Sequence, residues 1–287
     1  MQNSKFLFVG NRFYVLNEML KMGLNITKIY AVKESFLEKE LARQNVSYTL
    51  LPEKRKFLNE LRGADFDVLI SNGCPYILPV SGLSFGKRKF VNIHPSLLPD
   101  LKGKNPINGA LLFNRRHGVT CHYMDDGIDT GKVIEQLEIP VTDDINLDLL
   151  YQISFRAEGM VFKRAYENAF RIKDARFHRG EYIYYTKKES DRNISLNDSA
   201  EMVLRKVKAF GSVNQYACFI HNEKIIEAVS AVKIENEIVR NLFQTGSHNV
   251  IKAVYGDRYV LVEFDGMLIQ FQLHDISSFE TGDVFIG

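Results

Sequence analysis

Two short polar segments carry the side chains best suited to proton and acyl-group chemistry. In the first, residues 91–99, an apolar run leads directly into an amide, Asn92, and an imidazole, His94. Because these residues are two apart, both side chains project from the same face of an extended chain. In the second, residues 124–131, three aspartates and two glycines follow another apolar run. Amide, imidazole and carboxylate groups are therefore available at two candidate strand ends.

These group types suit acyl transfer if they meet in one place. An amide donates hydrogen bonds to an oxyanion, an imidazole moves a proton near neutral pH, and a carboxylate orients the imidazole or accepts a proton. Other interpretations are open, because a histidine after a strand is often structural, and aspartates with glycines commonly form turns. Composition alone predicts an α/β enzyme of unspecified activity.

The first half of the chain alternates compact apolar runs with helical patterns. Strands are expected at 5–9, 28–32, 46–51, 67–71, 90–93, 119–124 and 133–139. Helices are expected from Phe13 to Gly23 and at 36–44, 53–62, 105–114 and 146–170. This alternation predicts an α/β fold with a doubly wound, mostly parallel, Rossmann-like sheet. Ligands bind such sheets at the carboxyl ends of the strands, where both polar segments emerge.

The remaining chain predicts a second, smaller unit. Residues 171–194 lack a sustained apolar period and are expected to be a linker with one short strand at 182–185. A helix is expected at 198–210, and strands at 217–221, 224–233, 250–255, 259–264 and 267–273, with a hairpin turn at Asp265-Gly266. We therefore expect a catalytic domain over 1–170, a linker over 171–194 and a β-barrel-like (OB-like) C-terminal domain over 195–287.

Composition and charge exclude several classes of protein. The chain is 45% hydrophobic with a net charge of +2, which argues against a disordered chain and gives no general case for nucleic acid or an anionic membrane. No apolar run is long enough to span a bilayer. The three cysteines, Cys74, Cys121 and Cys218, contain no Cys-x-x-Cys, and His117 and His122 lack a third ligand. We expect a cytoplasmic protein without disulfides or a metal site.

The polar segments, taken with their neighbours, resemble the folate-dependent formyltransferase family. The resemblance is carried by residues 92–99, 102–103, 105–106, 118–120 and 124–131, in matching order and spacing. The family includes glycinamide ribonucleotide transformylase, methionyl-tRNA formyltransferase and the sugar-nucleotide N-formyltransferases. The resemblance continues through residues 182–192 and 194–211 and weakens after about residue 214.

The resemblance implies a donor, a mechanism and a set of site residues. The donor would be the co-substrate N10-formyltetrahydrofolate and the acceptor a primary amine, without a covalent enzyme intermediate or a metal. Asn92 would bind the oxyanion, His94 would act as general base or polarising acid, and Asp129 would hold His94 and relay the proton. The residues that would line the pteridine pocket are Cys74, Pro75, Tyr76, Ile77 and Leu78, together with Met124, Asp125 and Asp126.

Three features bear on the identity of the amine. The purine enzyme has no C-terminal barrel, which would leave about ninety residues of this chain unexplained. From Asn197 onward, eight lysines and arginines face twelve aspartates and glutamates, and no basic insertion follows the second strand, so binding of tRNA phosphates is disfavoured. The turn after the first expected strand reads Gly10-Asn11-Arg12 and lacks the Gly-x-Gly-x-x-Gly pattern of dinucleotide-binding sites. A pyrophosphate could sit at this helix start, with Lys102 and Lys104 adding phosphate contacts.

We therefore expect a sugar-nucleotide N-formyltransferase that partners a nucleotide-linked amino sugar and neither nucleic acid nor a membrane. The resemblance favours dTDP-4-amino-4,6-dideoxyglucose as acceptor, for O-antigen (lipopolysaccharide) synthesis, and family habit suggests a homodimer. The amino position, the base and the sugar itself do not follow from the sequence. The alternatives are a methionyl-tRNA formyltransferase, a formyltetrahydrofolate hydrolase and a non-catalytic folate or nucleotide binder.

Overall fold

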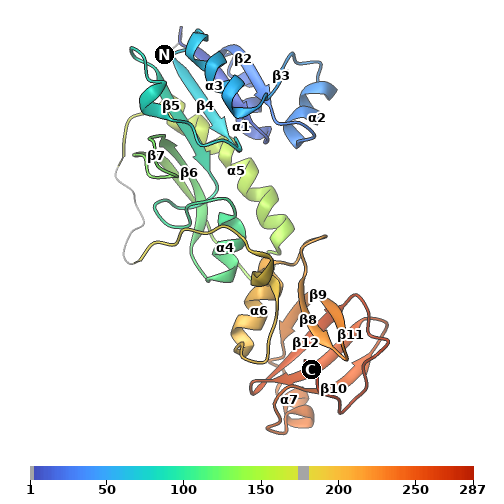
Figure 1. The fold of residues 1–287 in the computed structure, drawn as a ribbon. Coiled ribbons are helices and arrows are strands. Elements are labelled where there is room, and N and C mark those ends of the chain that lie inside the picture. The colour runs from blue at the N-terminus through green and yellow to red at the C-terminus, as the bar shows by residue number, and fades with distance from the viewer. Residues whose placement is uncertain (1–2, 174–180) are drawn as a thin grey trace. The chain divides into compact units, whose positions relative to one another are not determined.

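The computed structural model describes residues 3–173 and 181–287, which form two compact units (Figure 1). Within the described residues, the first unit comprises 3–106, 116–141, 151–173 and 181–185, and the second comprises 107–115, 142–150 and 186–287. The two units thus interleave along the chain. The expected domain division stays a prediction, and residues 174–180 of the expected linker lie outside the described residues.

The first unit is built on a seven-stranded sheet with the order β3-β2-β1-β4-β5-β6-β7. Its strands are β1 (Lys5–Gly10), β2 (Asn25–Ala31), β3 (Thr49–Leu50), β4 (Val68–Asn72), β5 (Lys89–His94), β6 (His117–Tyr123) and β7 (Val133–Ile139). Strands β1 to β5 pair in parallel, whereas β6 pairs antiparallel with both β5 and β7. The short β6–β7 connection leaves no room for the crossover that parallel strands require.

Helices follow the strands as the sequence pattern predicts. They are α1 (Tyr14–Lys21), α2 (Phe36–Arg43), α3 (Lys54–Gly63), α4 (Pro106–Leu112) and α5 (Leu147–Glu167), with a short 3-10 helix, η1 (Val80–Gly82). Ser35 caps α2 by accepting a hydrogen bond from the backbone N–H of Glu38. Gly23 follows α1 with a φ of 63°, a conformation that glycine adopts without strain. The expected strand at 46–51 is reduced to two residues.

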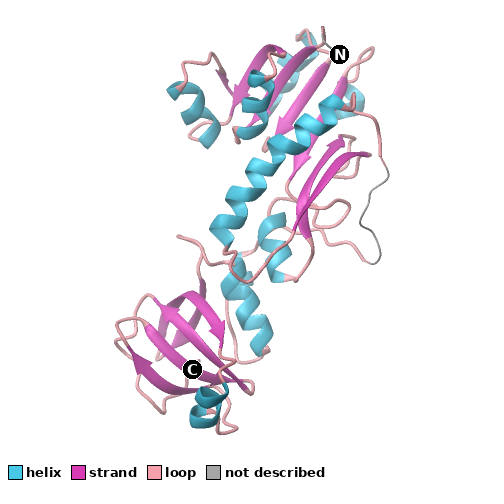
Figure 2. Cartoon of the chain, turned by 180° about the vertical axis from the view of Figure 1, so that it is seen from behind, coloured by secondary structure: helices cyan, strands magenta, loops and turns pink. Residues whose placement is uncertain are grey.

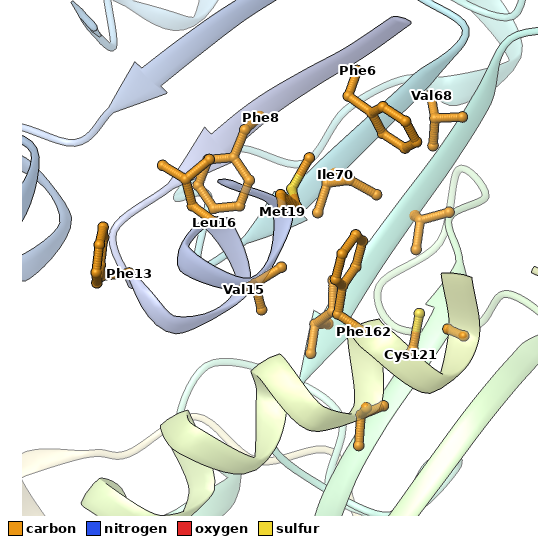
Figure 3. Close-up of a cluster of buried hydrophobic side chains, with 14 of the residues drawn as sticks. Phe6, Phe8, Phe13, Val15, Leu16, Met19, Val68, Ile70, Cys121 and Phe162 are labelled. Atoms are coloured by element: carbon orange, nitrogen blue, oxygen red, sulfur yellow. The ribbon is translucent and has the colours of Figure 1, made fainter. Parts of the chain in front are cut away.

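The apolar runs form strands because both faces of the sheet are buried. Along β1, Phe6 and Phe8 enter one buried cluster and Leu7 and Val9 enter another. Helices α1, α2 and α5 contribute side chains to the first cluster, and α3 contributes to the second. Figure 2 shows α5 lying across one face of the sheet, and Figure 3 shows Phe162 pointing from it into the first cluster.

The second unit contains an antiparallel five-stranded sheet with the order β10-β11-β12-β9-β8. Its elements are η2 (Glu189–Arg192), α6 (Ala200–Ala209), β8 (Ala217–His221), β9 (Lys224–Lys233), α7 (Glu237–Phe243), β10 (Val250–Tyr255), β11 (Tyr259–Phe264) and β12 (Met267–Leu273). Asp265 and Gly266 both have positive φ, as a tight two-residue hairpin requires. The predicted helix and all five predicted strands form.

Two local expectations for this part of the chain were wrong. Helix α7 was not expected, because its apolar residues Ile238 and Leu242 are each 70% exposed and follow no core-facing pattern. The strand expected at 182–185 is reduced to one bridge between Lys102 and Tyr184. Across 3–173 and 181–287, no helix is both long and apolar enough to span a bilayer.

The first core cluster predicts a contrast between two residues of α5. Phe162 is fully buried whereas Met160 is 50% exposed. Phe162→Ala should lower the free energy of unfolding by about 3–5 kcal/mol, because it leaves a cavity in a packed core. Met160→Ala should change it by less than about 0.5 kcal/mol. Urea unfolding of both variants measures the contrast, and equal effects would contradict the assigned core.

Candidate active site

The antiparallel pairing of β5 with β6 brings the expected reactive groups to the carboxyl end of β5. In this register Asn92 lies opposite His122, and His94 lies opposite Thr120. On its other side, β5 pairs in parallel with β4, with Ser71 beside Asn92. Polar side chains from β4, β5 and β6 therefore meet at the carboxyl end of β5, and open α/β sheets bind ligands at the carboxyl ends of their strands.

Asn92, His94 and Asp129 come together there. The Nδ1 of His94 lies 3.6 Å from Asp129 Oδ2, and the Nδ2 of Asn92 lies 3.5 Å from Asp129 Oδ1. The backbone N–H of Gly103 donates a 3.0 Å hydrogen bond to Asp129 Oδ2. The Asp129 side chain is 12% exposed, so the three groups share a site with little solvent access.

The backbone of the loop that carries Asp129 is tightly constrained. Asp129 has a φ of 53°, a left-handed conformation that aspartate tolerates better than most residues. Gly131 has no room for a side chain, because a Cβ there would lie 1.8 Å from the carbonyl oxygen of Tyr123. The Oδ1 of Asp125 accepts hydrogen bonds from the Gly127 N–H and the Thr130 hydroxyl and closes the turn. This loop holds the Asp129 carboxylate in one position.

His94 is arranged as a neutral base. Its Nε2 lies 3.0 Å from the carbonyl oxygen of Leu101, which can only accept, so Nε2 carries the proton. The unprotonated Nδ1 then faces the Asp129 carboxylate. Burial lowers the pKa of His94, while the Asp129 charge acts in the opposite direction. His94 is therefore neutral at pH 7, and an imidazolium formed by proton uptake at Nδ1 would be stabilised by Asp129.

His122 belongs to the site, although the sequence did not predict it there. We had considered it only as a metal ligand that lacks a third partner. Its Nδ1 donates a 2.7 Å hydrogen bond to its neighbour's carbonyl, Tyr123 O, so Nε2 is free to accept from the Asn92 amide at 3.2 Å. Burial lowers the pKa of His122 to about 4, which keeps the ring neutral. His122 thus fixes the orientation of the Asn92 amide. The antiparallel pairing of β6 with β5 places His122 opposite Asn92, and the sequence pattern did not predict the direction of β6.

Two further buried side chains hold the segment after β5. The hydroxyl of Thr120 donates to Ser96 O at 2.6 Å and accepts from the Leu98 N–H at 3.0 Å. The Nε2 of Gln136 donates to Leu98 O at 2.8 Å and to Thr120 Oγ1 at 3.0 Å. These hydrogen bonds fix the segment that follows His94. Gln136 carried no signal in the sequence beyond its place in an apolar strand.

The two stretches expected to form a pteridine pocket lie side by side. Cys74, Tyr76 and Met124 all pack against the second buried cluster, and the Ser81 N–H donates a 3.0 Å hydrogen bond to Asp126 Oδ1. Burial raises the pKa of the Cys74 thiol to about 11, so it is not a thiolate at neutral pH.

The other members of these stretches differ in exposure. Leu78 is 1% exposed and belongs to the core, whereas Ile77 is 52% exposed and Pro75 is also exposed. Asp125 and Asp126 have exposed positions and engage backbone groups of their own loop or of η1.

The expected phosphate contacts fall into two groups. Gly10 ends β1, Asn11 and Arg12 follow it, and Arg12 forms a 2.6 Å ion pair with Glu158 on α5. The Asn11 N–H donates to Asn72 O at 3.1 Å, and Asn72 Nδ2 donates to Ile93 O at 3.5 Å, so these residues are linked to the strand that carries His94. Lys102 is half-buried and precedes Gly103, which binds Asp129, whereas Lys104 is exposed. Within the described ranges, no group of three or more His, Cys, Asp or Glu residues could hold a metal ion.

Comparison with known proteins finds similarity to formyltransferases. Residues 30–165 match the family model described as formyl transferase. A methionyl-tRNA formyltransferase of Syntrophus aciditrophicus (strain SB) is 38% identical over 96 residues, 33% of this chain and 31% of that protein. The chain spans 31–57% of the length of the first curated relatives that it matches.

Solved structures resemble the chain over a much larger part of its length. The sugar 3N-formyl transferase WlaRD, crystallised with dTDP and 5-N-formyl-THF, matches 95% of this chain and 98% of its own with a TM-score of 0.73 and 20% identity. An N-formyltransferase from Helicobacter canadensis, in complex with folinic acid and dTDP-3-aminofucose, matches 94% of this chain and 100% of its own with a TM-score of 0.71 and 18% identity. These matches confirm the α/β fold with a smaller β-rich C-terminal part.

The buried histidines predict a pH-dependent stability. His117 is 1% exposed, with its Nε2 2.7 Å from Ser154 Oγ, and burial lowers its pKa to about 3. The unfolded chain takes up this proton near pH 6.5 while the folded chain does not, so stability falls as the pH drops below that value. Between pH 6.5 and 5, the wild type should lose about 2 kcal/mol more than His117→Asn. Urea unfolding against pH measures both curves, and parallel curves would contradict the assignment.

Proposed function

We propose that this chain, which carries a formyl transferase domain over residues 30–165, transfers a formyl group from N10-formyltetrahydrofolate to the amine of a nucleotide-linked amino sugar. The observation that carries the proposal is the meeting of Asn92, His94 and Asp129 at the carboxyl end of β5, within the matched domain. A binding module would have no need of a neutral imidazole beside a carboxylate and an oriented amide.

The geometry assigns a role to each group. The acceptor nitrogen forms a bond to the formyl carbon, and the resulting oxyanion accepts a hydrogen bond from Asn92. Asn92 Nδ2 donates one hydrogen to His122 Nε2 at 3.2 Å and makes a long 3.5 Å contact to Asp129 Oδ1 with the other, which the oxyanion would take over. His94 Nδ1 takes the amine proton, directly or through water, while Asp129 stabilises the imidazolium. The carbon–N10 bond then breaks, and the proton passes to N10.

The two stretches 74–78 and 124–126 are where we place the folate. They meet beside the trio, and backbone groups of an extended loop can supply the donors and acceptors that a pterin ring requires. The donor's formyl carbon would then face Asn92 and His94. The 5-N-formyl-THF and folinic acid in the WlaRD and Helicobacter canadensis structures support a folate donor for a protein of this fold.

For the acceptor we propose a dTDP-linked amino sugar, with dTDP-4-amino-4,6-dideoxyglucose as the compound favoured by the sequence. The segment Gly10-Asn11-Arg12 precedes helix α1, whose first turn has no side-chain cap, and an anion is favoured at such a position. Lys102 and Lys104 flank Gly103, whose backbone N–H donates to Asp129. The second unit carries net negative charge from Asn197 onward, which opposes tRNA binding.

Formylation of methionyl-tRNA is the second candidate, because curated relatives of this chain include methionyl-tRNA formyltransferases. Their similarity covers 33% and 61% of this chain. The two candidate functions share the donor and the chemistry and differ in the acceptor.

A product assay separates the candidates. The purified chain is mixed with N10-formyltetrahydrofolate and, in separate reactions, dTDP-4-amino-, dTDP-3-amino-, GDP-amino and UDP-amino sugars or charged initiator tRNA. Mass spectrometry should show formylation of a dTDP-amino sugar. Turnover of tRNA alone would overturn the proposed acceptor, and release of formate without any formylated acceptor would indicate a hydrolase.

Two substitutions test the proposed roles of the trio. Asn92→Ala should lower kcat by about 10²–10³-fold through loss of an oxyanion donor. His94→Ala should lower it by at least about 10²-fold through loss of the base. His248→Ala, an exposed histidine of the second unit, is the matched control and should retain wild-type turnover. Near-normal kcat in either trio variant would refute the assignment.

A further inference from the structure

Glu158 is a buried carboxylate in helix α5 that the proposed chemistry leaves unused. Its side chain is 0% exposed, and its Oε1 lies 2.6 Å from Arg12 Nη1. Its Oε2 accepts a 3.0 Å hydrogen bond from Asn72 Nδ2. Burial raises the pKa of Glu158 to about 7, which shows how strongly this environment opposes the charge. Since buried ion pairs add little net stability, stability alone is a weak reason for this arrangement.

The two partners of Glu158 stand at the ends of neighbouring parallel strands. Arg12 follows β1 by two residues, and Asn72 is the last residue of β4. The Asn11 N–H also donates a 3.1 Å hydrogen bond to Asn72 O, and Asn72 Nδ2 lies 3.5 Å from Ile93 O, next to His94. A single carboxylate therefore connects the β1–α1 turn to the sheet edge that carries the candidate trio.

Arg12 is fixed by contacts on one side, while part of its guanidinium group makes no hydrogen bond to the described residues. One nitrogen pairs with Glu158, and the guanidinium carbon lies 5.0 Å from the centre of the Phe155 ring. Arg12 Nε has no hydrogen-bond partner among the described residues, although it is buried. A Cβ on Gly73 would lie 1.9 Å from Asn11 Oδ1 and 2.9 Å from this Nε, so only glycine lets both side chains pack against the backbone there. An unpaired buried donor at a ligand-binding edge indicates a group that a ligand satisfies.

We propose that Glu158 is a positioning residue that holds Arg12 in one geometry for the pyrophosphate of a nucleoside diphosphate. Glu158 has no exposed surface of its own, so it acts through Arg12 rather than by contact with the ligand. An arginine in a turn loses side-chain entropy when it binds an anion, and fixing it beforehand removes part of that cost. The identity of the ligand rests on the proposed function, whereas the coupling between Glu158 and Arg12 does not.

The direct test is Glu158→Gln, with dTDP and inorganic pyrophosphate as probes. Glutamine removes the charge that pairs with Arg12 and replaces one acceptor oxygen by an NH2 donor, so it holds the guanidinium less firmly than glutamate does. The Kd for dTDP, measured by calorimetry without a formyl donor, should rise about tenfold, or about 1.4 kcal/mol. The KM for the dTDP-amino sugar should rise by a similar factor while kcat stays within about twofold. Glu167→Gln, on the exposed end of the same helix, is the matched control and should leave both constants unchanged.

A double-mutant cycle asks whether Glu158 acts through Arg12. Arg12→Ala should weaken dTDP binding, and adding Glu158→Gln to it should weaken binding no further. Fully additive losses would overturn the positioning role. If Glu158→Gln fails to fold, Arg12→Lys replaces it. Lysine keeps the charge but loses the planar fork that Glu158 orients, so unchanged dTDP binding in that variant would also overturn the inference.

The two proposals fail separately. If the wild type binds dTDP and loses affinity in Glu158→Gln but transfers no formyl group, the positioning role stands and the proposed function falls. If formyl transfer occurs with an unchanged dTDP affinity in Glu158→Gln, the reverse holds. A wild type that binds neither dTDP nor pyrophosphate overturns the positioning role.

Discussion

The candidate site depends above all on the antiparallel register between β5 and β6. In a sheet, a slip of one residue moves every side chain to the opposite face. The observed register places His122 against Asn92 and Thr120 against His94. One alignment therefore orients the amide and, through the hydrogen bonds of Thr120, fixes the backbone after the imidazole. Without it, Asn92 and His94 would not be held at their observed distances from Asp129.

Burial then sets the protonation states on which the chemistry relies. Removing imidazoles from water disfavours their charged form, so His94 and His122 are neutral in the folded protein. A neutral His94 can accept a proton, and a neutral His122 can accept the Asn92 hydrogen bond. The carboxylate that compensates the charge of a protonated His94 is supplied by a loop rather than by the sheet. The sheet thus supplies a base, and the 124–131 loop supplies the charge that makes its protonation favourable.

Much of the fold follows from local sequence signals, whereas the interior of the site does not. The strand alternation, the glycine after α1 and the Asp265-Gly266 hairpin are encoded within a few neighbouring residues, and the structure forms them as expected. The direction of β6 is a tertiary property, so His122 could not be placed opposite Asn92 in advance. Glu158 is one of several charged residues of α5, no local signal separates it from the exposed ones, and its partners lie 86 and 146 residues away. Helix α7 has a capping residue but no buried face, and no periodic signal identifies it.

The crowded backbone at Gly131 also limits how sequences of this kind can diversify. Any side chain there would collide with Tyr123 O, so the turn that delivers Asp129 tolerates very little variation. The exposed positions Pro75, Ile77 and Lys104 meet no such obstacle. New ligand preferences would therefore arise most readily by exchange at these exposed positions. The acid-bearing turn would be inherited unchanged, and libraries for altered selectivity would best be concentrated on the exposed positions.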